Sequence, residues 1–94
     1  MKVVWSRRAI RHLVHLREYL EKESEKGVAR VAGRMLEFVE VLQDHPNMGC
    51  PGRLPGTREL VVPGTSYIIP YRVRSERLEL IAVFHGRQQW PGKL

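Results

Sequence analysis

The sequence contains a single cysteine, Cys50, so no disulfide bond can form within the chain. It also lacks a long hydrophobic run, since no apolar stretch approaches the roughly 18 residues that a membrane span requires. The first residues lead directly into Arg7 and Arg8 and do not form the apolar centre of a signal peptide. Together these absences predict a protein of the reducing cytoplasm that does not enter a membrane.

Motifs of conventional enzymes are missing as well. The chain has no Walker loop, no paired glycines of a dinucleotide site, no zinc-ligand spacing and no nucleophile elbow. His12 and His15 lie three residues apart, but no third metal ligand accompanies them at a suitable spacing. We therefore expect no metal ion, no cofactor and no conventional small-molecule enzyme.

Acidic residues are few relative to basic ones. The 94 residues include 16 Lys and Arg against 10 Asp and Glu, which gives a net charge of +6. Most of these cations are arginines, whose planar guanidinium pairs with both oxygens of a phosphate or a carboxylate. The charge therefore predicts a partner rich in such groups, either a nucleic acid or an acidic protein segment.

Two amphipathic helices are predicted in the first half of the chain. A β-branched strand at Lys2–Trp5 precedes Ser6, which is a suitable N-cap for the first apolar stripe of helical spacing. This helix is expected to end before Gly27, a residue type that favours helix C-termini. A second stripe starts at Val28 and repeats at helical spacing until Pro46 ends it.

The last third of the chain alternates between apolar and polar residues. This pattern predicts a three-stranded antiparallel meander over residues 58–62, 65–74 and 77–85. Pro70 cannot donate an amide to a strand ladder, so it requires either an edge position or a bulge. Each of the two later strands is expected to place four side chains on one face: Tyr67, Ile69, Tyr71 and Val73, and then Leu78, Leu80, Ala82 and Phe84.

The predicted fold is α+β, with the order β-α-α-β-β-β in one domain over residues 1–94, because so short a chain leaves no room for a second core. The helical hairpin should pack on one face of a small, twisted, mainly antiparallel sheet and leave the other face open. Arg72 and Arg74 alternate with Tyr71, so we expect them on the open face.

Five segments carry a resemblance to a known family. They are 6–9 (Ser-Arg-Arg-Ala), 45–49 (His-Pro-Asn-Met-Gly), 56–60 (Gly-Thr-Arg-Glu-Leu), 67–73 (Tyr-Ile-Ile-Pro-Tyr-Arg-Val) and 83–91, which begins Val-Phe-His-Gly-Arg and ends Trp-Pro. In this order and spacing, over nearly the whole chain, they resemble the RelE/ParE toxin superfamily. The chain looks closest to its ParE-like and plasmid-stabilisation branch.

The resemblance implies a cytoplasmic toxin of a type II toxin–antitoxin system, which arrests growth and is neutralised by a cognate antitoxin. We expect the antitoxin to be a small, partly disordered protein. Its C-terminal segment, apolar on one side and acidic on the other, should cover a groove along the helical hairpin or add to a sheet edge. Operator DNA is expected to be bound only through the antitoxin. The residues predicted to bind the antitoxin are Leu13, Leu16, Leu20, Val31 and Met35.

Some ParE-like members of the family inhibit DNA gyrase, and gyrase inhibition by binding alone is the favoured function. The mRNA-cutting relatives carry a Tyr, Lys or second His near the C-terminus, whereas here the tail has no Tyr and only Lys93. Basic residues and one tryptophan are the predicted target-binding set: Arg7, Arg8, Arg11, Arg72, Arg74, Arg87 and Trp90.

The alternative is a RelE-like endonuclease that cuts mRNA on the 70S ribosome without a metal. Attack by the 2′-hydroxyl needs an acid, a base and cations around the phosphate. His85 and Glu59 are the candidate acid and base, and Arg58, Arg72 and Arg87 the candidate cations. His85 is better explained as a structural residue that ends a strand. A third possibility is an inert relative that only binds the antitoxin.

Overall fold

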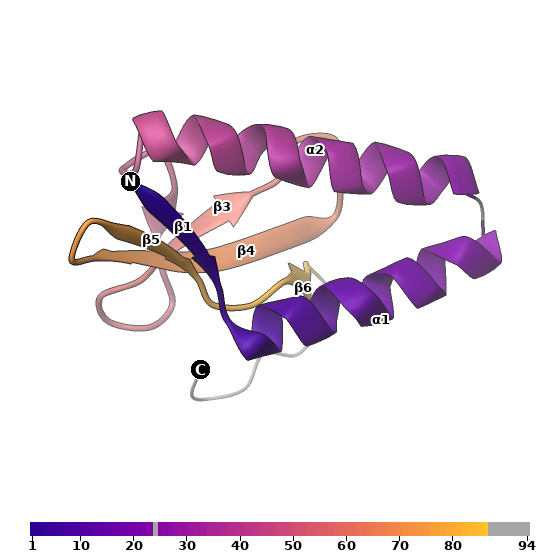
Figure 1. The fold of residues 1–94 in the computed structure, drawn as a ribbon, viewed down its shortest axis with the longest axis horizontal. Coiled ribbons are helices and arrows are strands. Elements are labelled where there is room, and N and C mark those ends of the chain that lie inside the picture. The colour runs from indigo at the N-terminus through magenta and orange to yellow at the C-terminus, as the bar shows by residue number, and fades with distance from the viewer. Residues whose placement is uncertain (24, 87–94) are drawn as a thin grey trace.

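A computed structural model describes residues 1–23 and 25–86 of the chain. The predicted order of elements is confirmed, and two short strands, β2 and β6, add to it (Figure 1). The elements are β1 (Lys2–Trp5), α1 (Arg7–Glu23), α2 (Glu25–Asp44), β2 (Cys50–Pro51), β3 (Arg58–Val61), β4 (Tyr67–Arg74), β5 (Arg77–Leu80) and β6 (Phe84–His85).

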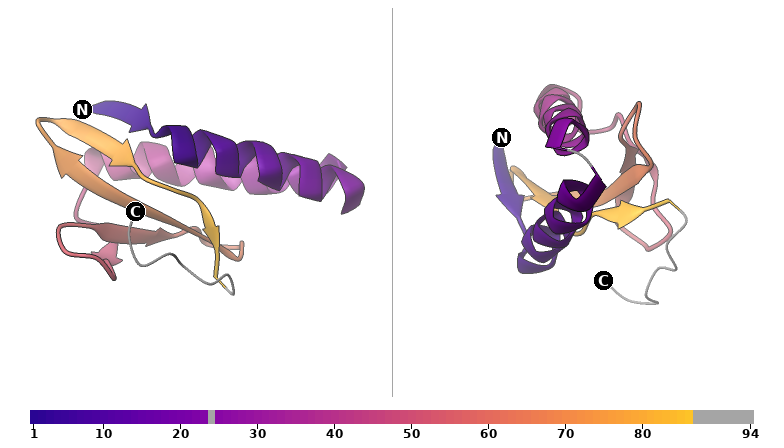
Figure 2. Two further views of the ribbon diagram at one scale, coloured as in Figure 1. Left: turned by 90° about the horizontal axis from the view of Figure 1, so that it is seen from below. Right: turned by 90° about the vertical axis from the view of Figure 1, so that its right-hand side faces the viewer.

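The strands form one mixed sheet in the order β1-β5-β4-β3-β2, with β6 paired to β4. The first strand runs parallel to β5, and the other pairings of the described strands are antiparallel. The two helices lie together on one side of this sheet (Figure 2), as predicted. In the part of the chain that the structure describes, neither helix has an apolar stretch long enough to cross a bilayer.

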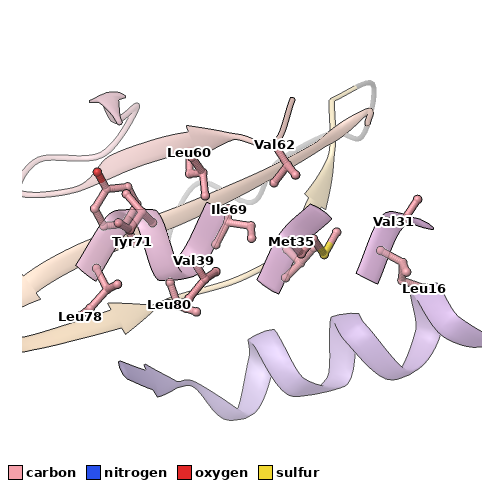
Figure 3. Packing of buried hydrophobic residues seen from close by; sticks show 12 residues of the cluster. Leu16, Val31, Met35, Val39, Leu60, Val62, Ile69, Tyr71, Leu78 and Leu80 are labelled. Carbon is pink, nitrogen blue, oxygen red and sulfur yellow. The ribbon is translucent and has the colours of Figure 1, made fainter. Parts of the chain in front are cut away.

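The core lies between α2 and the sheet. Figure 3 shows Met35 and Val39 of α2 facing the sheet residues Ile69 and Leu80, and all four side chains are buried. Burying an apolar side chain of this size stabilises a fold by about 1.5–3 kcal/mol. The buried residues of α2 recur at the predicted spacing and are Val31, Met35, Val39 and Leu42.

Ser6 starts α1 as predicted. Its Oγ accepts a hydrogen bond from Ala9 N at 3.0 Å, which satisfies one of the free amides of the first turn. The same hydroxyl donates to Ile81 O at 2.5 Å, so the cap also ties the helix start to the sheet.

The first helix ends before Gly27, as predicted, but Gly27 is not its C-terminal residue. Helix α1 already ends at Glu23 and α2 begins at Glu25, so Gly27 lies in the first turn of α2. The apolar stripe that begins at Val28 marks the first apolar residue of α2, whereas the helix itself starts at Glu25. Glu25 is favourable there because a carboxylate interacts well with a helix N-terminus.

The expectation of one continuous strand over residues 77–85 is wrong. Tyr71 pairs with Leu80 and Ile68 pairs with Phe84, so three residues lie opposite two. This extra residue is a bulge, and it lies opposite Pro70, whose carbonyl accepts from Ile81 N at 2.9 Å. The bulge therefore accommodates the missing amide of Pro70 within the sheet, which is one of the two predicted solutions.

The bulge reverses the alternation beyond it. The core cluster includes Leu78, Leu80 and Val83. Phe84 pairs with Ile68, whose side chain lies on the other face of β4. Phe84 is nevertheless buried, because it packs against the His12 ring of α1 with the ring centres 5.1 Å apart. Leu78 and Phe84 therefore do not share a face, contrary to the expectation.

A buried hydroxyl holds the segment after α2 against the sheet. Tyr71 Oη donates to Pro46 O at 2.7 Å and accepts from Gly49 N at 2.9 Å. A Cβ atom at position 49 would lie 2.6 Å from this hydroxyl, so only glycine fits there. Burial raises the pKa of Tyr71, and the hydroxyl therefore stays protonated as a donor.

Candidate functional site

An apolar hollow of about 230 Å³ opens between α1 and α2. Three of the predicted antitoxin-binding residues, Leu13, Leu16 and Met35, line it. Leu20 and Val31 line a neighbouring hollow at the start of β4, so the structure spreads the predicted set over two adjoining surfaces. Both surfaces belong to the helical side of the molecule.

Other residues of this hollow were not among those predicted to bind. Leu36 is the most exposed apolar residue among them, at 60%. Together with Val28 and Ala32, it forms a row spaced four residues apart along α2, and such a row lies on one helix face. This spacing is the signal in the sequence that identifies them. We call this hollow, which includes Leu36, the helical groove.

The opposite side of the sheet is rich in arginine. Arg72 and Arg74 alternate with the buried Tyr71, so they lie on the face away from the helices, as predicted. Arg72 Nε lies 2.6 Å from Glu79 Oε1, and Arg74 Nε lies 3.5 Å from the same oxygen. The hydrogen bond from Arg72, followed by the charge of Arg74, lowers the pKa of Glu79, although desolvation opposes this.

Arg8 reaches this open face from α1. It lines a hollow of about 240 Å³ together with Arg72 and Glu79. The structure thus brings together two of the predicted target-binding residues that are far apart in the sequence. Arg7 and Arg11, also predicted to bind the target, are exposed on α1 outside this hollow.

Two residues of the predicted nuclease set are already bound to the protein itself. Arg58 Nη1 donates to Gly49 O at 3.0 Å and to Asn47 O at 3.4 Å, so this cation holds the loop after α2. Glu59 Oε2 accepts from Arg53 N at 2.7 Å, and the Arg53 side chain lies 3.7 Å from its other oxygen. These contacts give Arg58 and Glu59 a structural role, because each residue holds a neighbouring loop in place.

His85 and Arg72 lie on opposite faces of the sheet. His85 pairs with Tyr67 and therefore lies on the same face as Tyr67. Tyr67 and Arg72 are five residues apart in β4, so their side chains lie on opposite faces of the sheet. The rings of His85 and Tyr67 meet edge to face at 5.5 Å. The structure therefore does not gather His85, Arg58 and Arg72 in one pocket. Arg87 and Trp90, the other predicted site residues, lie outside the described residues.

The family model of the ParE toxin of the type II toxin–antitoxin system, parDE, matches residues 3–90. The chain belongs to the ParE toxin family. It is 42% identical over 90 residues to "Putative toxin Y4kP" of Sinorhizobium fredii (strain NBRC 101917 / NGR234), and the match covers 96% of this chain and 93% of that one. The resemblance found in the sequence is thus confirmed.

Solved structures agree on the fold of the toxin. The chromosomal ParDE system from P. aeruginosa matches with a TM-score of 0.80 and 23% identity, over 90% of this chain and 95% of the other. The intact E. coli RelBE toxin–antitoxin complex matches with a TM-score of 0.57 and 12% identity, over 93% and 98%. The toxin therefore has the architecture shared by these two systems.

A fourth hollow on the toxin gathers histidines and tyrosines. It measures about 420 Å³, and its lining includes His12, His15, Tyr19, Tyr67 and His85. His12 Nδ1 accepts from Val83 N at 3.0 Å, which requires a neutral imidazole. Burial, and then the charges of Arg8 and Arg11, lower the pKa of His12. Among residues 1–23 and 25–86, no group of three His, Cys, Asp or Glu side chains is arranged to hold a metal ion.

Proposed function

We propose that this ParE-family toxin arrests growth by binding DNA gyrase through its open sheet face, without chemistry of its own. The observation that carries the proposal is that Arg72 and Arg74 share the Glu79 carboxylate on the sheet face turned away from α2, and that Arg8 lines the same hollow as Arg72 and Glu79. Such a surface attracts and orients an anionic partner. Gyrase is the named target because some ParE-like toxins inhibit it.

Neutralisation is proposed to use the other side of the molecule. The helical groove is apolar and exposes Leu36, so it suits an amphipathic segment of the cognate antitoxin. Arg17 also lines this groove, and an acidic residue on the segment would pair with it. The antitoxin would then contact residues that the gyrase contact does not use.

One experiment tests the target. Full-length toxin is added to gyrase supercoiling reactions and, separately, to ribosomes programmed with a defined mRNA. Loss of supercoiling with intact mRNA, reversed by the antitoxin, is the expected result. Arg72→Gln should weaken the inhibition, whereas Arg34→Gln, a change of equal charge on α2, should leave it unchanged.

The ribosome-dependent mRNA endonuclease is the second candidate, because His85 lies in a hollow with two further histidines and two tyrosines. These groups offer an acid and a base without Arg58 or Glu59. Cleavage in the ribosomal A site that is abolished by His85→Ala would establish this function and overturn gyrase inhibition. Inactivity in both reactions would identify an inert relative that only binds the antitoxin.

A further inference from the structure

We propose that the hollow between Arg8 and Arg72 is a receptor for one carboxylate side chain of an acidic protein segment. The inference rests on the proposed function in one respect, namely that the open face contacts the target. It goes beyond that function because it names the chemical group that is bound and the two arginines that bind it. The hollow has a volume of about 240 Å³, which is enough for a carboxylate and its methylene stem.

The first argument is a guanidinium nitrogen without an acceptor. Arg8 Nη1 is buried and has no hydrogen-bond partner among the described residues. A charged donor that is removed from water and left unpaired costs free energy, so such atoms are usually paired. Arg8 lines the hollow, and an anion bound there would supply the missing acceptor.

The second argument is the local balance of charge. Glu79 is the only acidic residue that the described part of the chain contributes to the lining, and Arg72 and Arg74 already share its Oε1 atom. Arg77 is close enough to contribute to the lowered pKa of the same carboxyl group. Cations therefore outnumber anions around the hollow even before Arg8 is counted. Glu79 acts as a positioning residue that holds the Arg72 side chain in place.

The remaining lining favours a carboxylate of a protein over the phosphates of a nucleic acid. Val4 and Ile81 contribute apolar lining, which suits the methylene groups of Asp or Glu. Within residues 1–23 and 25–86, no residue of the lining is aromatic, so this part of the hollow offers no surface on which a base could stack. Glu79 would also repel the next phosphate of a nucleic-acid backbone. A single carboxylate bound at Arg8 would not bring a second phosphate close to Glu79.

The position of Arg8 supports the same occupant. Arg8 is the second residue of α1, and Ser6 fixes that helix start by its bonds to Ala9 N and Ile81 O. Cations in a first helical turn are unfavourable for the helix, whereas an anion beside that turn is favourable. A bound carboxylate would therefore offset the charge of Arg8 and interact well with the N-terminus of α1.

The test uses full-length toxin and capped tetraglutamate as the probe, with binding followed by NMR of the arginine side-chain Nε–H groups. We expect tetraglutamate to shift the Arg8 and Arg72 signals and capped tetraglutamine not to shift them. Arg8→Gln should raise the dissociation constant about tenfold, because it removes the unpaired donor. Arg34→Gln, which changes the net charge equally on α2, should change it by less than about twofold.

Three results would overturn the proposal. The first is an equal loss of affinity in Arg8→Gln and Arg34→Gln, which would mean attraction by net charge alone. The second is the absence of any shift of the Arg8 signal in the wild-type toxin, and this result needs no variant to fold. The third is displacement of tetraglutamate by a single-stranded oligothymidylate, which would assign the hollow to a nucleic acid.

The probe also separates this inference from the proposed function. Tetraglutamate binding in a toxin that leaves gyrase active would reject gyrase as the target but keep the carboxylate site. Gyrase inhibition that persists in Arg8→Gln and Arg72→Gln, both without tetraglutamate binding, would keep the function and reject the site as its contact.

Discussion

The helical side and the open sheet side of this toxin expose different chemistry. Leu36 and Val14 are 60% and 49% exposed on the helices, whereas the side chains of Arg72 and Arg74 are 41% and 63% exposed on the sheet. Apolar contacts are non-directional and contribute in proportion to the area buried. Charged contacts contribute mainly specificity and the rate of association. The two surfaces of this small domain therefore suit partners of different chemistry.

The largest expected effect concerns the core that both sides share. Met35 is only 2% exposed, so Met35→Ala should lower the free energy of unfolding by about 2–5 kcal/mol, through lost burial and the cavity that remains. Leu36→Ala, at the adjacent exposed position, should change it by about 0.5 kcal/mol or less. Urea denaturation of both variants measures the difference. Similar losses would show that Met35 does not join the helices to the sheet.

The next effect separates the two sides by affinity. Leu36→Glu should weaken antitoxin binding by about 2 kcal/mol or more, because it places a charge at the centre of an apolar contact. Val61→Glu is the matched control, since Val61 is 55% exposed but lies on β3 opposite Ile68, on the open face. Calorimetric titration with the antitoxin measures both. Equal weakening would mean that the antitoxin covers the sheet as well.

A smaller effect is expected on the charged side. Arg72→Gln should raise the toxin concentration needed to inhibit supercoiling by about tenfold, since it removes the cation nearest Glu79 and one wall of the Arg8 hollow. The difference from wild type should shrink as salt is raised, because exposed charges are screened. An effect that does not depend on salt would contradict an electrostatic contact.

The smallest effect is a pH dependence of stability through His12. Its pKa is lowered in the fold, first by burial, so the unfolded chain binds a proton more readily. The stabilisation is therefore complete above the unfolded value of about 6.5 and is lost as the pH falls through the folded value. His12→Gln keeps an acceptor for Val83 N but does not titrate. Between pH 7.5 and pH 5.5, the variant should lose less stability than wild type in urea denaturation.

Much of the fold could be predicted because its signals are local. The spacing of Val31, Met35 and Val39 identifies the buried side of α2, and the alternation of Tyr71 and Arg72 identifies the two faces of β4. The early start of α2 was missed because periodicity reports burial and not helix boundaries. The bulge was foreseen only as one of two solutions for Pro70, since its place depends on which strand pairs with β4.

The candidate sites were less predictable, because they too depend on which strands and helices pack together. Because His85 can act as an acid or base and Arg72 can bind a phosphate, the sequence suggested that both belong to one nuclease site. Only the pairing of Tyr67 with His85 shows that His85 lies away from Arg72. Nothing in the sequence brings Arg8 close to Arg72, because that contact depends on where α1 starts relative to β5. The Ser6 hydroxyl sets this position through its bond to Ile81 O.

The sequence by itself therefore determined the family, the order of the main helices and strands, and the side to which α2 and β4 turn their apolar residues. These properties follow from spacings of two to four residues, which are local properties of the sequence and do not depend on the tertiary structure. Only the tertiary structure decided that β1 lies parallel to β5, that a bulge lies opposite Pro70, and that Arg8 meets Arg72 around one hollow. Such contacts join residues far apart in the chain, and they depend on strand register and helix placement.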